Sequence, residues 1–143
     1  MNIDATYRFT QPRERVWAVL LDVDAVAGCL PGCQGLQSTG ENTYRTDLVI
    51  GAGPVSGRFT ASIALEDQQP PRSYRLRMEA SGGPGFVRGE GRITLEEEDG
   101  GTAVHVAATA DVGGTVARVG QRLLAGVARA TMERFFACLG KRM

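Results

Sequence analysis

The chain lacks the features that mark several large classes of protein. Its 143 residues carry a formal net charge of zero, so no general electrostatic attraction would hold it on a nucleic acid. No apolar run approaches the roughly 20 residues of a membrane-spanning helix. The first residues, MNIDATYRFTQ, have neither the basic nor the apolar stretch of a secretory signal. These absences predict a cytoplasmic protein that does not bind nucleic acid.

Residue types that carry chemistry are scarce. The chain has one histidine and three cysteines, and an odd number of cysteines without an export signal predicts free thiols in a reducing compartment. Cys29 and Cys33 could be two metal ligands, but a zinc site needs four, and the only other candidates are His105 and Cys138. We interpret Cys29 to Cys33 as an elbow between a helix and a strand, and we expect no metal.

Glycine is plentiful, with 19 residues, but its positions do not form a nucleotide-binding motif. The loops at 51–54 and 82–85 lack the Gly-Lys-Ser/Thr ending of a phosphate loop and the spacing of a dinucleotide-binding turn. Turn geometry explains both loops, so no cofactor is expected.

Alternation of apolar and polar residues is the strongest pattern in the chain. It runs through residues 2–10 and through five further segments that begin near residues 44, 55, 74, 87 and 104. One apolar and one polar face in each segment is typical of an antiparallel sheet with one side in water.

Helical spacing occurs on either side of the five later segments. Pro12 can begin a short helix, and Asp24 can cap a second one that ends near Leu30. A long helix is predicted from about Thr115 to Leu139, with a length of roughly 37 Å. Its apolar face comprises Val116, Val119, Leu123, Val127 and Ala130, and its opposite face comprises Arg118, Arg122 and Arg129.

These elements predict an α+β fold in one ligand-binding domain, residues 1–143. A curved antiparallel sheet of about seven strands must wrap the long helix to bury its apolar stripe. The two short helices follow the first strand. The inner surface then consists of the apolar strand faces.

This inner surface is expected to hold an apolar ligand, because many of its side chains are small. The small inward residues are Gly57, Ala61, Gly89, Gly91, Ala108 and Ala110, with Gly120, Gly126 and Ala130 of the helix. A tight core fits the pattern equally well, since glycines also permit strand bending and close helix approach. The candidate ligand-binding residues are Tyr44, Leu48, Phe59, Ile63, Tyr74, Leu76, Met78, Val87, Gly89, Ile93, Val104, Val106, Leu123 and Val127.

The inward faces hold no group suited to proton transfer. They contain no carboxylate, histidine or lysine, and their polar atoms are essentially the hydroxyls of Tyr44, Thr46 and Tyr74. Acid–base catalysis needs a positioned proton carrier, so we expect no catalytic residues and no enzyme. This prediction depends on the strand register, because a slip of one residue would exchange the two faces.

The last helix and the tail are basic. Arg118, Arg122 and Arg129 are candidates for contact with a partner or a membrane, and Phe136 lies among them on a helical wheel. The alternative is that the cations stabilise the helix C-terminus and that Phe136 packs on the two short helices.

Six stretches, in order along the chain, resemble the CoxG family of carbon monoxide dehydrogenase accessory proteins, within the START-like helix-grip superfamily. They are PRERVWAVL (12–20), CLPGC (29–33), GAGPVSG (51–57), PPRSY (70–74), SGGPGFVRGEG (81–91) and VGGTVARVGQRLLAGVA (112–128). The resemblance implies a helix-grip fold and a non-catalytic accessory role beside a molybdenum hydroxylase of the carbon monoxide dehydrogenase type.

The resemblance also implies a lipid- or quinone-like ligand, held by the inward residues, and a link between the enzyme and the membrane or its quinone pool. Some family members continue beyond the domain with a tail suited to membrane anchoring. This chain stops at Met143, so the basic helix face is the candidate for transient contact at the inner face of the membrane.

Two other functions stay open. Some relatives in the superfamily are cyclases or hydrolases, and an enzyme of this kind would need Arg88, Glu90, Arg92 or His105 to face inward. A protein–protein adaptor would have a packed core and would dock through the C-terminal helix.

Overall fold

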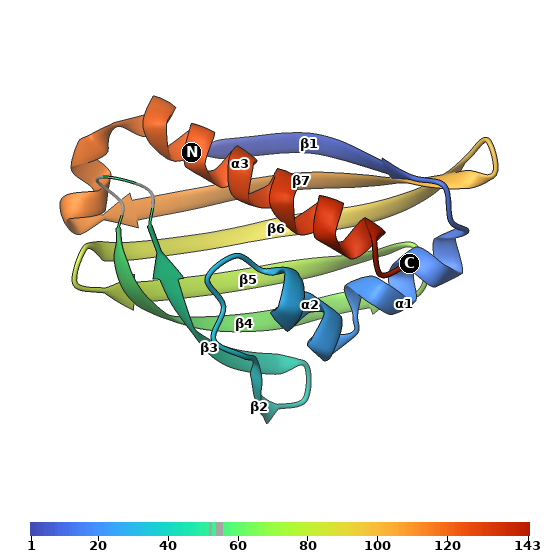
Figure 1. The fold of residues 1–143 in the computed structure, drawn as a ribbon, viewed down its shortest axis with the longest axis horizontal. Helices are drawn as coiled ribbons and strands as arrows, with labels where there is room; N and C mark the ends of the chain where they lie inside the picture. Colours follow the sequence, from blue (N-terminus) through green and yellow to red (C-terminus); the bar gives the residue numbers. More distant parts are fainter. Residues whose placement is uncertain (52, 54–55) are drawn as a thin grey trace.

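The computed structural model describes residues 1–51, 53 and 56–143 (Figure 1). Strand β1 (Asn2–Phe9) leads into helices α1 (Arg13–Leu20) and α2 (Val23–Cys29). The other strands are β2 (Gln37–Gly40), β3 (Thr43–Ile50), β4 (Gly57–Gln69), β5 (Ser73–Gly82), β6 (Gly85–Glu98) and β7 (Gly101–Gly113). The last elements are the 3-10 helix η2 (Gly114–Val119) and helix α3 (Gln121–Gly140).

The seven strands form one antiparallel sheet in the order β1-β7-β6-β5-β4-β3-β2. Figure 1 shows the three α-helices on the same side of this curved sheet, with α3 lying across it. The predicted fold class, a curved antiparallel sheet with a C-terminal helix and two short helices after the first strand, is confirmed. We call the side that carries the helices the inner face.

The alternation in the sequence determines the face on which each side chain lies. Val104 and Val106 of β7 are buried on the inner face, whereas His105 between them lies on the outer face and is partly exposed. Residues that pair across strands share a face, so Leu76 stands beside Leu65 of β4 and Gly91 of β6. The predicted inward and outward faces of the strands are confirmed.

The two short helices begin at recognisable residues. Pro12 precedes α1, and its carbonyl accepts hydrogen bonds from the backbone N–H groups of Arg15 and Val16. The Asp22 carboxylate caps α2 by accepting bonds from the N–H groups of Asp24 and Ala25 at 3.0 and 3.3 Å. The prediction that Asp24 is the cap is therefore wrong by two residues, because both aspartates suit the role and backbone geometry decides between them.

The predicted long helix is broken near its start. Gly120 has φ 92° and ψ 152°, a conformation that residues with a side chain rarely adopt. Residues 114–119 form the 3-10 helix η2 before this break, and α3 extends over 20 residues after it, or about 30 Å. The expectation of a continuous helix from Thr115 is wrong.

The break also changes which face of α3 meets the sheet. Leu124 is 8% exposed, whereas Leu123 is 42% exposed. Gly126 and Ala130 are exposed as well. The prediction that Leu123, Gly120, Gly126 and Ala130 face the sheet is wrong, because Gly120 uncouples Val116 and Val119 from the helical phase of α3.

A disulfide joins α2 to the last turn of α3. Cys29 and Cys138 are 109 positions apart in sequence, and their Cα atoms lie 5.4 Å apart. The expectation of free thiols holds only for Cys33. Spacing along the chain could not reveal this pair, because the two cysteines meet only where α2 packs on α3.

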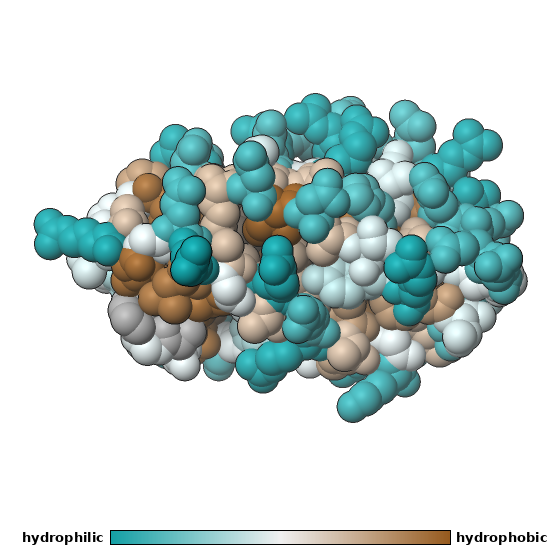
Figure 2. Space-filling view, turned by 90° about the horizontal axis from the view of Figure 1, so that it is seen from above, coloured by the Kyte–Doolittle hydropathy of each residue, from teal (hydrophilic) through white to brown (hydrophobic). Residues whose placement is uncertain are grey.

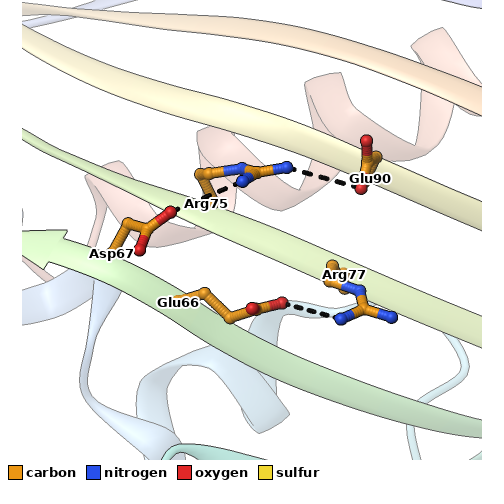
Figure 3. A network of polar contacts seen from close by, with 5 residues as sticks. All are labelled: Glu66, Asp67, Arg75, Arg77 and Glu90. Carbon is orange, nitrogen blue, oxygen red and sulfur yellow. Dashed lines mark hydrogen bonds and ion pairs between the residues drawn. The ribbon is translucent and has the colours of Figure 1, made fainter.

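The outer face carries a lattice of charged side chains (Figure 3). Arg75 reaches Asp67 and Glu90, each at 3.5 Å, and Arg77 reaches Glu66 at 3.3 Å. These side chains are 39–61% exposed, so each pair contributes at most about 1 kcal/mol to stability. The lattice keeps the outer face in water and leaves the inner face to the apolar residues.

Candidate ligand-binding site

Buried residues on the inner face fall into two separate clusters. The first, which we call the packed end, lies under α1, α2 and the last turns of α3. It contains Val16, Val19, Leu20, Ala25, Cys29, Tyr74, Ile93, Leu95, Val104, Val106, Phe136 and Leu139. The second, which we call the far end, contains Phe59, Ala61, Ala80, Val116 and Leu124. The inner face is thus closed at both ends.

Between these clusters lie two rows of residues that cross the sheet from strand to strand. One row is Ile3, Ala108, Gly91, Leu76 and Leu65, and the other is Ala110, Gly89, Met78, Ile63 and Tyr44. All ten residues are partly exposed. We call them the middle band, and it is the part of the inner face that is incompletely covered.

Small side chains create much of the space at the middle band. Gly89 pairs with Ala110 and Gly91 pairs with Ala108, so four adjacent positions of β6 and β7 carry at most a methyl group. A Cβ atom built on Gly89 would have the Thr109 carbonyl oxygen, at 3.2 Å, and Ala110 as its nearest neighbours. These neighbours belong to β7, so the space over the four positions is not filled from α3.

Helix α3 covers this space with apolar groups. Leu124 and Val127 pack against the far end. The Thr131 hydroxyl donates to the Val127 carbonyl oxygen at 2.8 Å, so the helix satisfies its own polar atom. The helix side of the site is therefore as apolar as the sheet side.

Few polar groups border the site. The buried Thr46 hydroxyl lies 3.1 Å from the Cys33 thiol, which is the free cysteine. Tyr74 is 5% exposed and packs edge-on against Trp17, and burial raises the pKa of its hydroxyl well above the usual value. Both tyrosine and threonine hydroxyls are neutral donors at physiological pH, which suits an uncharged ligand.

The charged residues that an enzyme would need lie on the other side of the sheet. Arg88, Glu90 and Arg92 are exposed on the outer face, where Arg88 lies 3.7 Å from Glu79. His105 accepts or donates a hydrogen bond with the Thr6 hydroxyl at 3.0 Å, also on the outer face. None of these four side chains reaches the middle band.

The candidate ligand-binding residues divide among the three regions of the inner face. Tyr44, Ile63, Leu76, Met78 and Gly89 belong to the middle band, and Tyr74, Ile93, Val104 and Val106 belong to the packed end. Leu48, Phe59 and Val127 belong to the far end, and Val87 lies beside it. Leu123 faces away from the site. Sequence reasoning left out Ile3, Leu65 and Leu124, and the pairing of Leu65 with Leu76 is the signal that could have found one of them.

The basic residues of the C-terminal segment occupy different places. Arg118 belongs to η2, and Arg122 and Arg129 belong to α3, and all three are exposed. Phe136 is 5% exposed, and its ring stacks on Tyr7 with the centroids 4.3 Å apart. The prediction that Phe136 contacts a partner or membrane is wrong, because β1 covers the flank of α3 that carries it.

The surface of the molecule has several small apolar patches. Figure 2 shows brown apolar groups among teal polar side chains, with one patch beside the grey residues at one end. Within the described residues, no helix is both long and apolar enough to cross a membrane. The same residues contain no group of three or more His, Cys, Asp or Glu side chains that could hold a metal ion.

Comparison with known proteins agrees with this architecture. The family model described as the carbon monoxide dehydrogenase G protein, CoxG, matches residues 6–143. The chain belongs to the CoxG family. In this CoxG protein the inner face has two buried clusters, with the middle band between them.

Solved structures support the CoxG assignment and the fold. A conserved protein from Geobacillus kaustophilus is 38% identical, with a TM-score of 0.97 over 99% of this chain and 94% of that chain. A START superfamily protein from Mycobacterium smegmatis is 15% identical, with a TM-score of 0.74 over 99% and 95%. Ara h 8.0201 is 14% identical, with a TM-score of 0.71 over 99% and 96%. The last two show the fold alone. No curated protein matches the chain in sequence.

Proposed function

We propose that this CoxG protein binds an uncharged apolar ligand, lipid- or quinone-like, over the middle band. The observation that carries the proposal is the interruption of the core: ten inner-face residues stay partly exposed between two fully buried clusters. Apolar side chains that remain exposed in the interior of a fold are characteristic of ligand pockets. The domain, residues 1–143, then acts as a single ligand-binding unit.

The size of the expected affinity follows from the area that a ligand would bury. Burial of about 400 Å² of apolar surface at about 25 cal/mol per Å² gives roughly 10 kcal/mol. Loss of ligand freedom offsets several kcal/mol of this, so a dissociation constant in the micromolar range is expected. Such an affinity suits a protein that picks up and delivers its ligand.

The biological role that we propose is that of a non-catalytic accessory protein. The family description names a component of carbon monoxide dehydrogenase. We therefore propose association with a molybdenum hydroxylase of that type, in the cytoplasm, with transient recruitment of the enzyme to the inner face of the membrane. The absence of charged groups from the middle band supports binding over catalysis, since it leaves no proton carrier beside the ligand.

The ligand proposal is tested first by native mass spectrometry of the freshly purified protein, followed by organic extraction and identification of what is released. A bound lipid or quinone would support the proposal and name the class of ligand. Titration with the neutral dye Nile red provides a second measurement on protein stripped of any ligand. An unliganded mass together with no Nile red binding would contradict the proposal.

A matched pair of variants locates the ligand. Ala110→Phe places a ring in the middle band, whereas Ala107→Phe places the same ring on the exposed outer face of the same strand. We expect Ala110→Phe to weaken Nile red binding at least tenfold and Ala107→Phe to leave it within about twofold, since removal of a well-filled contact area costs about 1.4 kcal/mol or more. Equal effects of the two variants would place the dye elsewhere.

A further inference from the structure

Helix α3 carries a second concave surface on the side that faces away from the sheet. A groove of about 660 Å³ runs along this side, and its lining includes Val119, Arg122, Leu123, Gly126, Ala130 and Arg134. The middle of the groove is apolar and its two ends carry arginines. Because the ligand site lies beneath α3, this groove on its outer side is a separate surface.

Gly126 has no role that the fold of this chain explains. It lies in the middle of α3 and is exposed, and a Cβ atom built on it meets nothing within 4 Å. Glycine in a helix interior costs about 1 kcal/mol relative to alanine. A small residue here, with Ala130 one turn further along, lets the backbone of another helix approach closely.

The charges around the groove are of one sign. From Val112 to Met132 the chain contains no aspartate or glutamate. No ion pair among residues 1–51, 53 and 56–143 includes Arg118, Arg122, Arg129 or Arg134. The whole chain has a net charge of zero, so this basic strip is a local excess that selects an acidic counterpart.

The dimensions of the groove favour a helix as its occupant. Arg122 and Arg134 are twelve positions apart, which is about 18 Å along α3 and equals about three turns of a second helix. A second copy of this chain would bring arginine against arginine. An anionic membrane surface would be matched better by a protruding apolar ridge than by a hollow.

We infer that the α3 groove docks an acidic amphipathic helix of a partner protein, with small apolar side chains against Gly126 and Ala130. Carboxylates about three turns apart pair with Arg122 and Arg134. The inference gives the chemistry of the partner contact and rests on the proposed function only for the existence of a partner. Ligand binding over the middle band does not enter its test.

The test uses three synthetic helical peptides and fluorescence anisotropy on the full chain. The first has an alanine and leucine stripe between glutamates twelve positions apart, the second has lysines in their place, and the third has glutamines. We expect binding of the acidic peptide, at least tenfold weaker binding of the glutamine peptide, and no binding of the lysine peptide. Equal binding of the three, or no binding of the acidic peptide, would overturn the inference.

Charge reversal provides a matched set of variants. Arg122→Glu combined with Arg134→Glu should abolish binding of the acidic peptide and should create binding of the lysine peptide. Arg129→Glu makes the same change on α3 outside the groove lining and should weaken the acidic peptide by no more than about threefold. If Arg129→Glu weakens binding as much as either groove substitution, general attraction to a basic protein replaces the inference.

Gly126→Leu separates docking from stability. The leucine fills the groove and raises helix propensity, so the melting temperature should rise or stay unchanged while peptide binding falls at least tenfold. The same variant is tested on phosphatidylcholine vesicles with and without phosphatidylglycerol. Tight binding to the anionic vesicles that the peptide does not displace would assign the groove to the membrane and overturn the inference.

Discussion

The packed end and the middle band are built from the same strands, but they differ in what stands over them. Leu95 and Val104 of the packed end are 1% and 0% exposed, because α1, α2 and the last turns of α3 press on them. One or two rows away, Gly91 and Ala108 present so little side chain that α3 does not fill the space above. The same sheet therefore provides stability at one end and room at its centre.

The difference shows how a small protein can be stable and still hollow. Two clusters of buried side chains brace the helix at both ends, so the centre does not need to contribute packing energy. Substitutions at the packed end should therefore affect stability, whereas substitutions in the middle band should affect binding.

The sharpest test of this comparison is truncation of one side chain in each region. We expect Leu95→Ala to lower the free energy of unfolding by about 2–5 kcal/mol, since it leaves a cavity in a close-packed cluster. Met78→Ala in the middle band should cost only about 1 kcal/mol, because Met78 is already partly exposed. Urea denaturation at neutral pH measures both values, and similar losses in the two variants would remove the distinction between the regions.

Reduction of the disulfide should loosen the packed end. Cys29 and Cys138 close a loop with a sequence separation of 109, and a bond of this kind contributes about 2–4 kcal/mol by restricting the unfolded chain. We expect dithiothreitol to lower the melting temperature of the wild type and to leave the Cys29→Ala, Cys138→Ala double variant unchanged. The free thiol of Cys33 provides the control, since Cys33→Ser should keep the response to dithiothreitol.

Alkaline pH should act on the packed end through Tyr74. Burial raises the pKa of its hydroxyl in the folded state above the usual value near 10, so the protonated form is favoured by folding. The stabilising contribution is complete below the unfolded pKa and is lost as pH rises above it, by up to about 1.4 kcal/mol per pH unit. Denaturation curves at increasing pH should therefore fall less steeply for Tyr74→Phe than for the wild type, and parallel curves would contradict this cause.

The outer face should give the smallest effect. Arg75→Ala removes two exposed ion pairs, with Asp67 and Glu90, and should cost less than about 1 kcal/mol. Thermal melts in low and high salt should converge, because salt screens such pairs. A loss of several kcal/mol would mean that the charged lattice, and not the packed end, holds the sheet together.

The sequence predicts most of the sheet because its pattern has a period of two. Residues such as Val104, His105 and Val106 alternate without interruption, and a period of two assigns each to a face with no further information. The fold class and the identity of the inward strand residues follow from this pattern. Membership of the middle band does not, since partial exposure depends on how α3 lies above Gly89 and Gly91.

The C-terminal segment is where sequence reasoning fails, and the cause is one residue. Gly120 interrupts the helical phase, so Leu124 replaces Leu123 on the inner side and Phe136 turns toward β1. A period of 3.6 tolerates two neighbouring leucines almost equally, and only contacts with the rest of the fold choose between them. The Cys29–Cys138 bond escaped for the same reason, because both partners depend on the position of α3.

The Cys29–Cys138 bond also determines how the molecule would respond to a mechanical load on its two ends. A pull on Met1 and Met143 in the oxidised protein can extend only residues 1–28 and 139–143, since the bond carries the force past everything between. At about 3.5 Å per residue the chain would lengthen to roughly 120 Å, against roughly 500 Å after reduction. The entire sheet from β2 to β7 is thus shielded from tension, and a single rupture event in a force–extension trace would report the oxidation state of the bond.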